Sequence, residues 1–238
     1  MGNYVVLGAS GGVGQEVVSI LKSKGENVIA CSRSIEKISF LNTPSKIFNA
    51  TLPKETEDAF LEIKETHGTI DGVVNCIGSV ILKPAHLTSD SEFEETLRIN
   101  LWTSFGTIKA SVKCMNSEGG SIVLCSTAAS RIGLANHEAI AAAKGAVQGL
   151  MLSSAATYAS KNIRVNCVAP GLVETGMTEK ITKNPSALKF SQDMHALKRI
   201  GHPKDIAQMI CFLLSPENNW ITGQTFGVDG GLGTIQSK

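Results

Sequence analysis

The sequence is poor in aromatic side chains and carries no strong excess of charge. Phenylalanine, tryptophan and tyrosine together make up 5% of its 238 residues, and only Tyr4 and Tyr158 are tyrosines. The formal net charge of +1 gives no general attraction to nucleic acid or to an anionic membrane surface. We therefore expect neither a nucleic-acid partner nor a membrane partner.

Long hydrophobic runs and cysteine motifs are also missing. The longest apolar stretches, such as "IVLC" (122–125) and "MICFLL" (209–214), are far too short to span a bilayer. The start, "MGNYVVLGAS", enters a strand-like run without a basic flank, so no signal peptide is expected. The six cysteines form no C-x-x-C pair and no cluster at metal-ligand spacing, which predicts neither disulfides nor a metal site. A reduced, cytoplasmic protein is the expectation.

Short β-rich runs alternate with helical patterns along the whole chain. The expected strands are 4–7, 27–32, 46–48, 71–78, 121–126, 163–170 and 224–228. The expected helices are 15–25, 55–68, a long region from about 90 to 117, 136–160 and 203 to about 214. This alternation predicts an α/β fold, a doubly wound parallel sheet of about seven strands with helices on both faces. Without a repeat or linker, residues 1–238 are expected to form a single Rossmann-type domain.

A glycine-rich turn joins the first expected strand to the first expected helix. It contains Gly8, Ser10, Gly11, Gly12, Val13 and Gly14. Such a turn lets the backbone approach a pyrophosphate, whose charge meets exposed N–H groups at the helix N-terminus. A tight turn alone would also use glycine, but the strand–turn–helix context predicts a dinucleotide-binding site.

The end of the second strand bears on which dinucleotide binds. NAD-binding folds usually carry an acidic residue here, whereas this chain has Ser32 followed by Arg33 and no carboxylate before Glu36. Arg33 can form a forked contact to a 2′-phosphate, and Ser32 removes the charge that would repel it. The alternative is that Arg33 is only a solvated surface charge. We expect NADP(H) to be preferred, with NAD(H) possible.

Several further motifs resemble those of the short-chain dehydrogenase/reductase superfamily, and the resemblance covers nearly the whole chain. The turn has the family's G-x-x-x-G-x-G form, "NCIG" resembles its N-N-x-G, and "RINLW" carries its mid-helix asparagine. "LCSTAAS" holds the strand-five serine, and "NCVAPG" resembles the stretch N-x-[VI]-x-P-G. The C-terminal "GHPKDIAQMICFLLSPENNWITGQTFGVDGG" is also similar. The resemblance implies an oxidoreductase acting on a small-molecule substrate.

The resemblance also implies roles on the cofactor side. Asn75 and Gly78 would line the adenosine side, and Thr51 stands where an adenine-contacting aspartate is usual. Val173 and Thr175 would contact the carboxamide, and the stretch that precedes them contains Pro170 and Gly171. The segment 174–195 has the place of the family's mobile substrate lid. Relatives pair the helices at 100–117 and 136–160, which implies a homo-oligomer, either a dimer or a tetramer.

Three residues would form the reaction end of the site. Lys144 would bond the nicotinamide ribose and lower the pKa of a neighbouring acid, Asn100 would hold a water, and Ser126 would bond the substrate oxygen. The family's Y-x-x-x-K, however, reads here as Ile140 followed by three alanines and Lys144. Tyr158 lies fourteen residues past Lys144, roughly 21 Å along a helix. General acid catalysis contributes about 10²–10⁴-fold, so the usual carbonyl reduction would suffer without this tyrosine.

Three interpretations remain open. The acid is relocated to His137 or Glu138; alternatively Asn136 caps the helix, Glu138 is a first-turn acid and His137 is solvated. A second possibility is reduction of a conjugated C=C bond, in which water protonates carbon, and dienoyl-thioester reductases of the superfamily resemble this chain in lacking that tyrosine. A third is an NADP(H)-holding regulatory or scaffold subunit without chemistry. We expect an NADP(H)-dependent oxidoreductase with an atypical proton donor, reducing a carbonyl or conjugated enoyl substrate, and keep the regulatory subunit as the alternative.

Overall fold

Seven parallel strands form one sheet in the computed structural model, which describes residues 1–235. The strands are β1 (Asn3–Leu7), β2 (Asn27–Ser32), β3 (Ser45–Ile47), β4 (Gly72–Asn75), β5 (Gly120–Cys125), β6 (Ile163–Pro170) and β7 (Thr225–Val228). Their order, β3-β2-β1-β4-β5-β6-β7, reverses direction between β1 and β4. Ligands of open α/β sheets bind beyond the carboxyl ends of the strands at such a reversal. The predicted fold class is confirmed.

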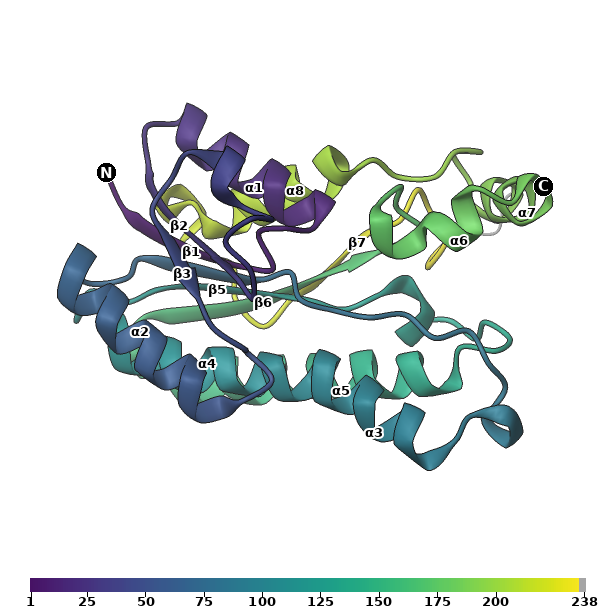
Figure 1. Cartoon of the computed structure of the whole chain (residues 1–238), viewed down its shortest axis with the longest axis horizontal. Helices are drawn as coiled ribbons and strands as arrows, with labels where there is room; N and C mark the ends of the chain where they lie inside the picture. The colour runs from purple at the N-terminus through teal and green to yellow at the C-terminus, as the bar shows by residue number, and fades with distance from the viewer. Residues whose placement is uncertain (236–238) are drawn as a thin grey trace.

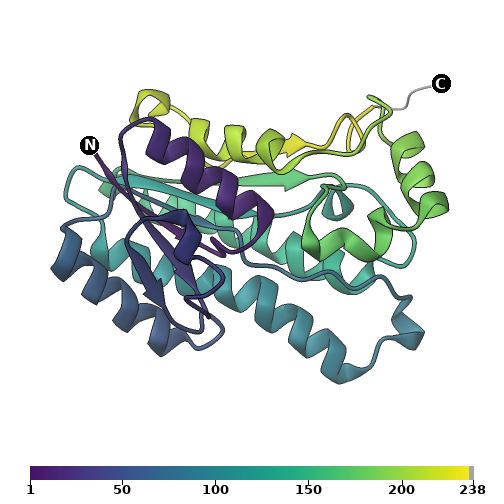
Figure 2. The ribbon, with the colours of Figure 1, turned by 45° about the horizontal axis from the view of Figure 1, so that its top comes forward.

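Helices cover both faces of the sheet (Figure 1). One face carries α1 (Gly12–Ser23) and α8 (Pro203–Leu214), and the other carries α2 (Pro53–His67), α3 (Asp90–Leu97), α4 (Thr103–Cys114) and α5 (Glu138–Tyr158). Seen from a second direction, α1 and α8 run side by side, in agreement with their many shared contacts (Figure 2). None of the helices within residues 1–235 is long and apolar enough to cross a membrane.

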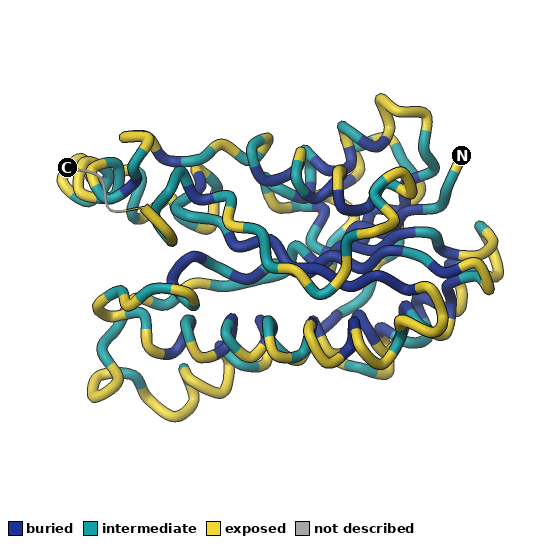
Figure 3. Tube along the Cα trace, turned by 180° about the vertical axis from the view of Figure 1, so that it is seen from behind, coloured by how far each residue is buried: buried dark blue, intermediate teal, exposed yellow. Residues whose placement is uncertain are grey.

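The core lies in two layers, one on each face of the strands. In β1, Val5 and Leu7 belong to the layer under α2, α4 and α5, whereas Tyr4 and Val6 belong to the layer under α1 and α8. The buried class follows the strands through the middle of the molecule, and the exposed class follows the outer sides of the helices (Figure 3). Burial on both faces explains why the strands read as continuous apolar runs.

The long helical region expected at 90–117 contains a widened turn. After α3, the residues Arg98–Trp102 form a π-helical turn, and the chain then continues as α4 to Cys114. Such single π turns inside a helix are frequent at functional sites. Asn100, one of the expected site residues, lies in this turn and is fully buried.

The polar segment 174–195 is more regular than the sequence indicated. It holds a short helix α6 (Glu179–Thr182) and a helix α7 (Pro185–Met194), both beyond the carboxyl ends of the central strands (Figure 1). Asn184 caps α7, because its Oδ1 accepts from the backbone N–H groups of Ser186 and Ala187, each at 3.1 Å. The movement expected of a lid stays a prediction.

Candidate functional site

The glycine turn after β1 is shaped by close backbone contacts. Gly8 has a φ of +75°, and a Cβ there would lie 2.9 Å from the backbone carbon of Cys76. A Cβ on Gly14 would lie 2.4 Å from the carbonyl oxygen of Gly8. No L side chain fits at either position without moving the backbone, so both glycines are required by packing.

The first turn of α1 is open to an anion. Gly11 is the N-cap and supplies no side-chain hydrogen bond, and no acidic residue lies in the first turn. The free N–H groups and the positive end of the helix dipole therefore fit a phosphate. A Cβ on Gly12 would come within 3.3 Å of Thr175 and 3.2 Å of Pro203, so the segment after β6 lies against this turn.

A cavity of about 210 Å³ adjoins the glycine turn. Seven of the expected cofactor-binding residues line it: Gly8, Ser10, Gly11, Ser32, Arg33, Thr51 and Gly78. The lining also includes Asn49, Ile77 and Ile99, which the sequence reasoning missed, and Met177, which lies in the segment 174–195 expected to form a substrate lid. Asn49 follows β3 outside any motif, and in "RINLW" the motif points to Asn100 and not to Ile99. Both residues reach the cavity only through the packing of the segment after β3 and of the π turn. The residues that line this cavity fit the adenosine side of a dinucleotide.

Arg33 is the one charged residue among those that line this cavity. Its side chain is exposed, and within residues 1–235 it makes no hydrogen bond or ion pair. The nearby carboxylate of Glu36 instead accepts a hydrogen bond from the Ser34 hydroxyl, which lowers the pKa of that carboxyl. Arg33 is thus free to meet an anionic group.

Two expected cofactor-binding residues use their side chains within the protein. Asn75 donates to the hydroxyls of Thr103 and Thr107, each at 3.2 Å, and its Oδ1 accepts from the Ile77 N–H at 2.9 Å. It therefore shapes the loop after β4 and ties that loop to α4. Thr51 accepts from the Arg98 guanidinium at 2.7 Å and lies 2.9 Å from Asn49 Oδ1.

The structure brings Asn100, Lys144 and Gly78 together. A Cβ built on Gly78 would lie 3.2 Å from Asn100 Oδ1 and 3.5 Å from Lys144 Nζ. Met177, from the segment after β6, approaches the same point to within 3.7 Å. These four residues come from four parts of the chain and meet beyond the carboxyl ends of β4 and β5.

Lys144 is buried, with 6% of its surface exposed. Its ammonium donates to the carbonyl oxygen of Cys125 at 2.8 Å. Burial is the main influence on its pKa and lowers it, while the neighbouring Cys125, Cys167 and Cys76 act in the opposite direction. A buried cation at this edge of the sheet is available to bond a ribose hydroxyl.

The side-chain amide of Asn100 makes hydrogen bonds through both its nitrogen and its oxygen. Its Nδ2 donates to the Thr96 carbonyl at 2.9 Å and to the Ser79 hydroxyl at 3.0 Å, and its Oδ1 accepts from the Ser79 N–H at 3.2 Å. The π turn places this side chain toward the loop after β4. Asn100 therefore joins α3 to that loop and fixes the wall of the site.

Ser126, just after β5, takes part in a hydrogen-bond cluster that the sequence reasoning missed. Its hydroxyl lies 3.1 Å from the Lys144 carbonyl oxygen and 3.0 Å from the Ser130 hydroxyl. Gln148 donates to Ser126 at 3.0 Å and to Ser130 at 2.6 Å. The available signal was a polar residue one helical turn after Lys144 on a face of α5 that is otherwise largely buried.

Ile140 lies one turn before Lys144 on α5 and is 4% exposed. The N-cap of α5 is His137, and Asn136 has a φ of +64°, so the expectation that Asn136 caps this helix is wrong. Glu138 is the acid of the first turn, as that reading predicted. The half-buried His137 places Nδ1 2.7 Å from the Ala135 carbonyl oxygen.

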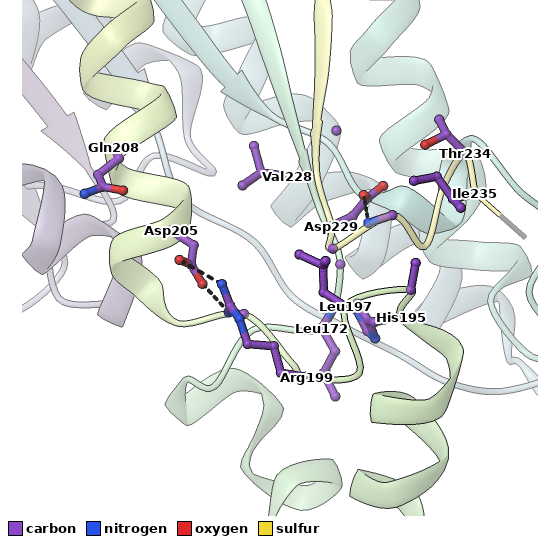
Figure 4. Close-up of a pocket in the computed structure, with 16 residues that line it drawn as sticks. Leu172, His195, Leu197, Arg199, Asp205, Gln208, Val228, Asp229, Thr234 and Ile235 are labelled. Atoms are coloured by element: carbon purple, nitrogen blue, oxygen red, sulfur yellow. Dashed lines mark hydrogen bonds and ion pairs between the residues drawn. The ribbon is translucent and has the colours of Figure 1, made fainter. Parts of the chain in front are cut away.

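A second hollow, of about 500 Å³, lies between α7, α8 and the end of β7 (Figure 4). Arg199 in its wall makes two hydrogen bonds to Asp205, at 2.7 and 3.3 Å, and Asp229 accepts from two backbone N–H groups at 3.0 Å each. Gly171, an expected cofactor-binding residue, lines this hollow and not the cavity beside the glycine turn. A Cβ on Gly171 would lie 2.5 Å from the His195 Nε2.

The last expected residues lie on the stretch that leaves β6. Pro170 ends β6, and Val173 is buried and bridges to Gly201 in a parallel arrangement. Thr175 begins a 3₁₀ turn, in which its backbone N–H donates to Thr178 Oγ1 at 3.1 Å. The stretch is therefore well held beside the carboxyl edge, and its contacts with a carboxamide stay a prediction.

The chain matches one protein family over almost its whole length. The family described as Enoyl-(Acyl carrier protein) reductase matches residues 8–233. Among individual proteins, the 3-oxoacyl-[acyl-carrier-protein] reductase FabG of Thermotoga maritima is 32% identical over 240 residues, which cover 96% of each chain.

Solved structures agree with this match. A short-chain type dehydrogenase/reductase from Mycobacterium ulcerans has a TM-score of 0.93 at 27% identity and covers 99% of this chain and 90% of its own. ElxO with NADP bound has a TM-score of 0.89 at 26% identity and covers 98% and 99%. The strand order changes direction between β1 and β4, a glycine turn follows β1, and the family match covers residues 8–233. The chain therefore belongs to the short-chain dehydrogenase/reductase superfamily of oxidoreductases.

Proposed function

We propose that this protein is an NADP(H)-dependent reductase that acts on a carbonyl or conjugated enoyl substrate with an atypical proton donor. One observation carries the proposal. Lys144, Asn100 and Ser126 gather at the carboxyl edge of the sheet, while an aliphatic side chain, Ile140, occupies the position one helical turn before the lysine. The cofactor, when bound, supplies the hydride.

The preference for NADP(H) rests on charge. Arg33 is exposed and unpaired within residues 1–235, and no carboxylate is among the residues that line the adjoining cavity. A guanidinium without a competing carboxylate favours a 2′-phosphate over a pair of ribose hydroxyls. ElxO, a structural relative, binds NADP. The preference is tested by the affinities for NADPH and NADH, and equal affinities would contradict it.

Helix geometry favours His137 over Glu138 as the proton donor. His137, the N-cap residue of α5, lies three residues before Ile140, which is one helical turn before Lys144, whereas the exposed Glu138 points about 160° around the helix from Ile140. Because a carbonyl oxygen only accepts, the bond from His137 Nδ1 to Ala135 places a proton on Nδ1. His137 therefore donates through Nε2 only as an imidazolium. Water at carbon, in enoyl reduction, is the other route.

The deciding experiment is turnover with a panel of ketones and enoyl thioesters, followed as NADPH oxidation. A reductase consumes NADPH with at least one class, and Lys144→Met removes that activity while Lys161→Met, an exposed lysine, keeps it. If both His137→Ala and Glu138→Ala leave the rate unchanged, neither residue is the acid. No turnover by the wild type, with turnover appearing in Ile140→Tyr, would favour the regulatory subunit.

We also propose that the chain forms a homo-oligomer through α4 and α5. Trp102 and Phe105 are 52% and 46% exposed at the start of α4, and Leu152 is 56% exposed on α5. The two aromatic rings meet edge to face with centroids 6.1 Å apart. Apolar side chains of this size are enriched at subunit interfaces. Sedimentation of the wild type and of Trp102→Glu tests this, and a monomeric wild type would contradict it.

A further inference from the structure

Hydrogen bonds join Ser126, Ser130 and Gln148 into one cluster between the end of β5 and α5. Gln148 lies one turn after Lys144, so that Ile140, Lys144 and Gln148 follow one another at intervals of four residues along one face of α5. This face presents an aliphatic group, an ammonium and an amide to the end of β5. The amide group reaches the two serine hydroxyls at 3.0 and 2.6 Å.

Each serine hydroxyl of this cluster has one proton and lies close to more than one acceptor. The Gln148 amide nitrogen only donates, and its two protons serve the two serine oxygens. The carbonyl oxygens of Thr127 and Lys144 only accept. Ser130 donates to the Thr127 carbonyl at 2.7 Å, and Ser126 can donate either to the Lys144 carbonyl at 3.1 Å or to the Ser130 hydroxyl at 3.0 Å. Both serine oxygens thus accept from the same amide, and the Ser126 proton has two acceptors at nearly equal distances.

The two serines differ in how firmly their protons are held. The Ser130 bond of 2.7 Å has the usual length of a hydroxyl-to-oxygen hydrogen bond, whereas the Ser126 bond of 3.1 Å is slightly longer than the usual range. Ser126 can turn its proton to another oxygen while its own oxygen still accepts from Gln148. An amide that donates to a hydroxyl oxygen also strengthens that hydroxyl as a donor, because hydrogen bonds in a chain polarise one another.

We infer that Gln148 is a positioning residue that holds the Ser126 hydroxyl and strengthens it as the hydrogen-bond donor to a substrate oxygen. The inference rests on the proposed reductase function. Because Ile140 has no hydroxyl group, Ser126 is the neutral hydroxyl donor at this edge of the sheet. The hydrogen bond from Gln148 strengthens Ser126 as a donor, and it thereby compensates for part of the polarisation of the substrate oxygen that a tyrosine at position 140 would supply. Gln148 itself does not touch substrate.

A double-mutant cycle on kcat separates this role from packing. In the wild-type background, Gln148→Met keeps the length of the side chain but removes both donors, and kcat is expected to fall about tenfold, the effect of one lost hydrogen bond. In the Ser126→Ala background the same change is expected to alter kcat less than twofold, because Gln148 acts through Ser126. Gln208→Met, on the exposed side of α8, is the matched control and keeps wild-type kcat.

Two further measurements complete the test. The affinity for NADPH is expected to stay within twofold of wild type in Gln148→Met, so that the effect appears in kcat and not in cofactor binding. Ser130→Ala retains the bond from Gln148 to Ser126 and is expected to lower kcat less than Gln148→Met does. The inference would be overturned if Gln148→Met lowered kcat equally in the wild-type and Ser126→Ala backgrounds, or did not lower it at all. A loss of kcat in Ser130→Ala as large as that in Gln148→Met would also overturn it. A wild type without turnover would overturn the proposed function as well, which distinguishes the two failures.

Discussion

The glycine turn and the reaction end of the site are built in different ways. The turn is made of backbone from a few consecutive residues, with Gly8 and Gly14 set by contacts of 2.9 and 2.4 Å to neighbouring backbone atoms. The reaction end is made of side chains that come from the π turn, from the end of β5 and from α5. Dinucleotide binding at the turn is therefore expected not to depend on which side chain stands at Ile140. A replacement at that position is expected to change turnover and to leave nucleotide binding in place.

The largest expected effect is at the turn itself. Gly14→Ala places a methyl group 2.4 Å from the Gly8 carbonyl oxygen, which must shift the turn, so nucleotide affinity is expected to fall below detection and stability by about 3 kcal/mol. Gly149→Ala is the matched control: its Cβ meets nothing within 4 Å in α5, and helix propensity predicts a gain of about 0.5–1 kcal/mol. Calorimetry and thermal unfolding measure both. Wild-type affinity in Gly14→Ala would refute the account of the turn.

The second effect belongs to the reaction end. Lys144→Met is expected to lower turnover by at least about 100-fold, the range of losses for a positioned catalytic group. Because burial lowers the pKa of Lys144, its charged form is disfavoured in the folded protein, and the neutral methionine is not expected to reduce the free energy of unfolding. Steady-state kinetics and urea unfolding give the two values. A Lys144→Met variant that loses stability and keeps turnover would show that Lys144 has a structural role and not a catalytic one.

Replacement of Arg33 is expected to have a smaller effect, on the affinity for NADPH. Arg33→Ala removes the charge that faces a 2′-phosphate, and the affinity for NADPH is expected to fall about 10- to 100-fold, in line with the loss of a charge-assisted hydrogen bond. The affinity for NADH should stay the same. Lys37→Ala, a nearby exposed lysine, serves as control and leaves both affinities unchanged. Parallel losses for NADPH and NADH would mean that Arg33 does not read the 2′-phosphate.

A further expected effect is a pH dependence of the free energy of unfolding, which arises from buried thiols on β2, β6 and α8. Burial raises the pKa of Cys31, Cys167 and Cys211 to about 12. Between pH 9 and 12 the unfolded chain loses thiol protons that the folded chain retains, so stability falls as the pH rises, by up to about 1.4 kcal/mol per unit for each thiol. Lys144, whose pKa is lowered, contributes with the opposite sign.

Denaturant unfolding from pH 8 to 10.5 measures this slope. Replacement of Cys31 and Cys211 by alanine is expected to flatten it, because two of the thiols whose pKa burial raises are then absent. A flat profile for the wild type would show that these thiols are not held protonated by burial.

Much of the fold was predictable from local patterns in the sequence. All seven strands were expected within a few residues, because a strand buried on both faces appears as a continuous apolar run bounded by glycine or polar residues. Strand β4 ends at Asn75 and not at Gly78, since the Asn75 side chain turns the chain away by bonding the Ile77 N–H. The helices α6 and α7 were missed because 174–195 is short of apolar periodicity and α7 depends on its Asn184 cap.

The candidate site was predictable only where a motif is local. Gly8, Gly14, Asn100 and Lys144 lie in short motifs whose spacing reflects one turn or one helix. The contacts of Gln148 with Ser126 and Ser130 join positions 18 to 22 residues apart through the packing of α5 on β5, and no single pattern shows them. Gly171 was assigned to the cofactor by its neighbours in the sequence, whereas the structure places it on the second hollow.

Titration calorimetry of the wild-type protein with NADPH and then NADH tests the central claim most directly. The account predicts uptake of one NADPH per chain, with NADH bound more weakly. Absence of heat and of any melting-temperature shift with both nucleotides would contradict it, since a family fold with an intact glycine turn would then hold no dinucleotide.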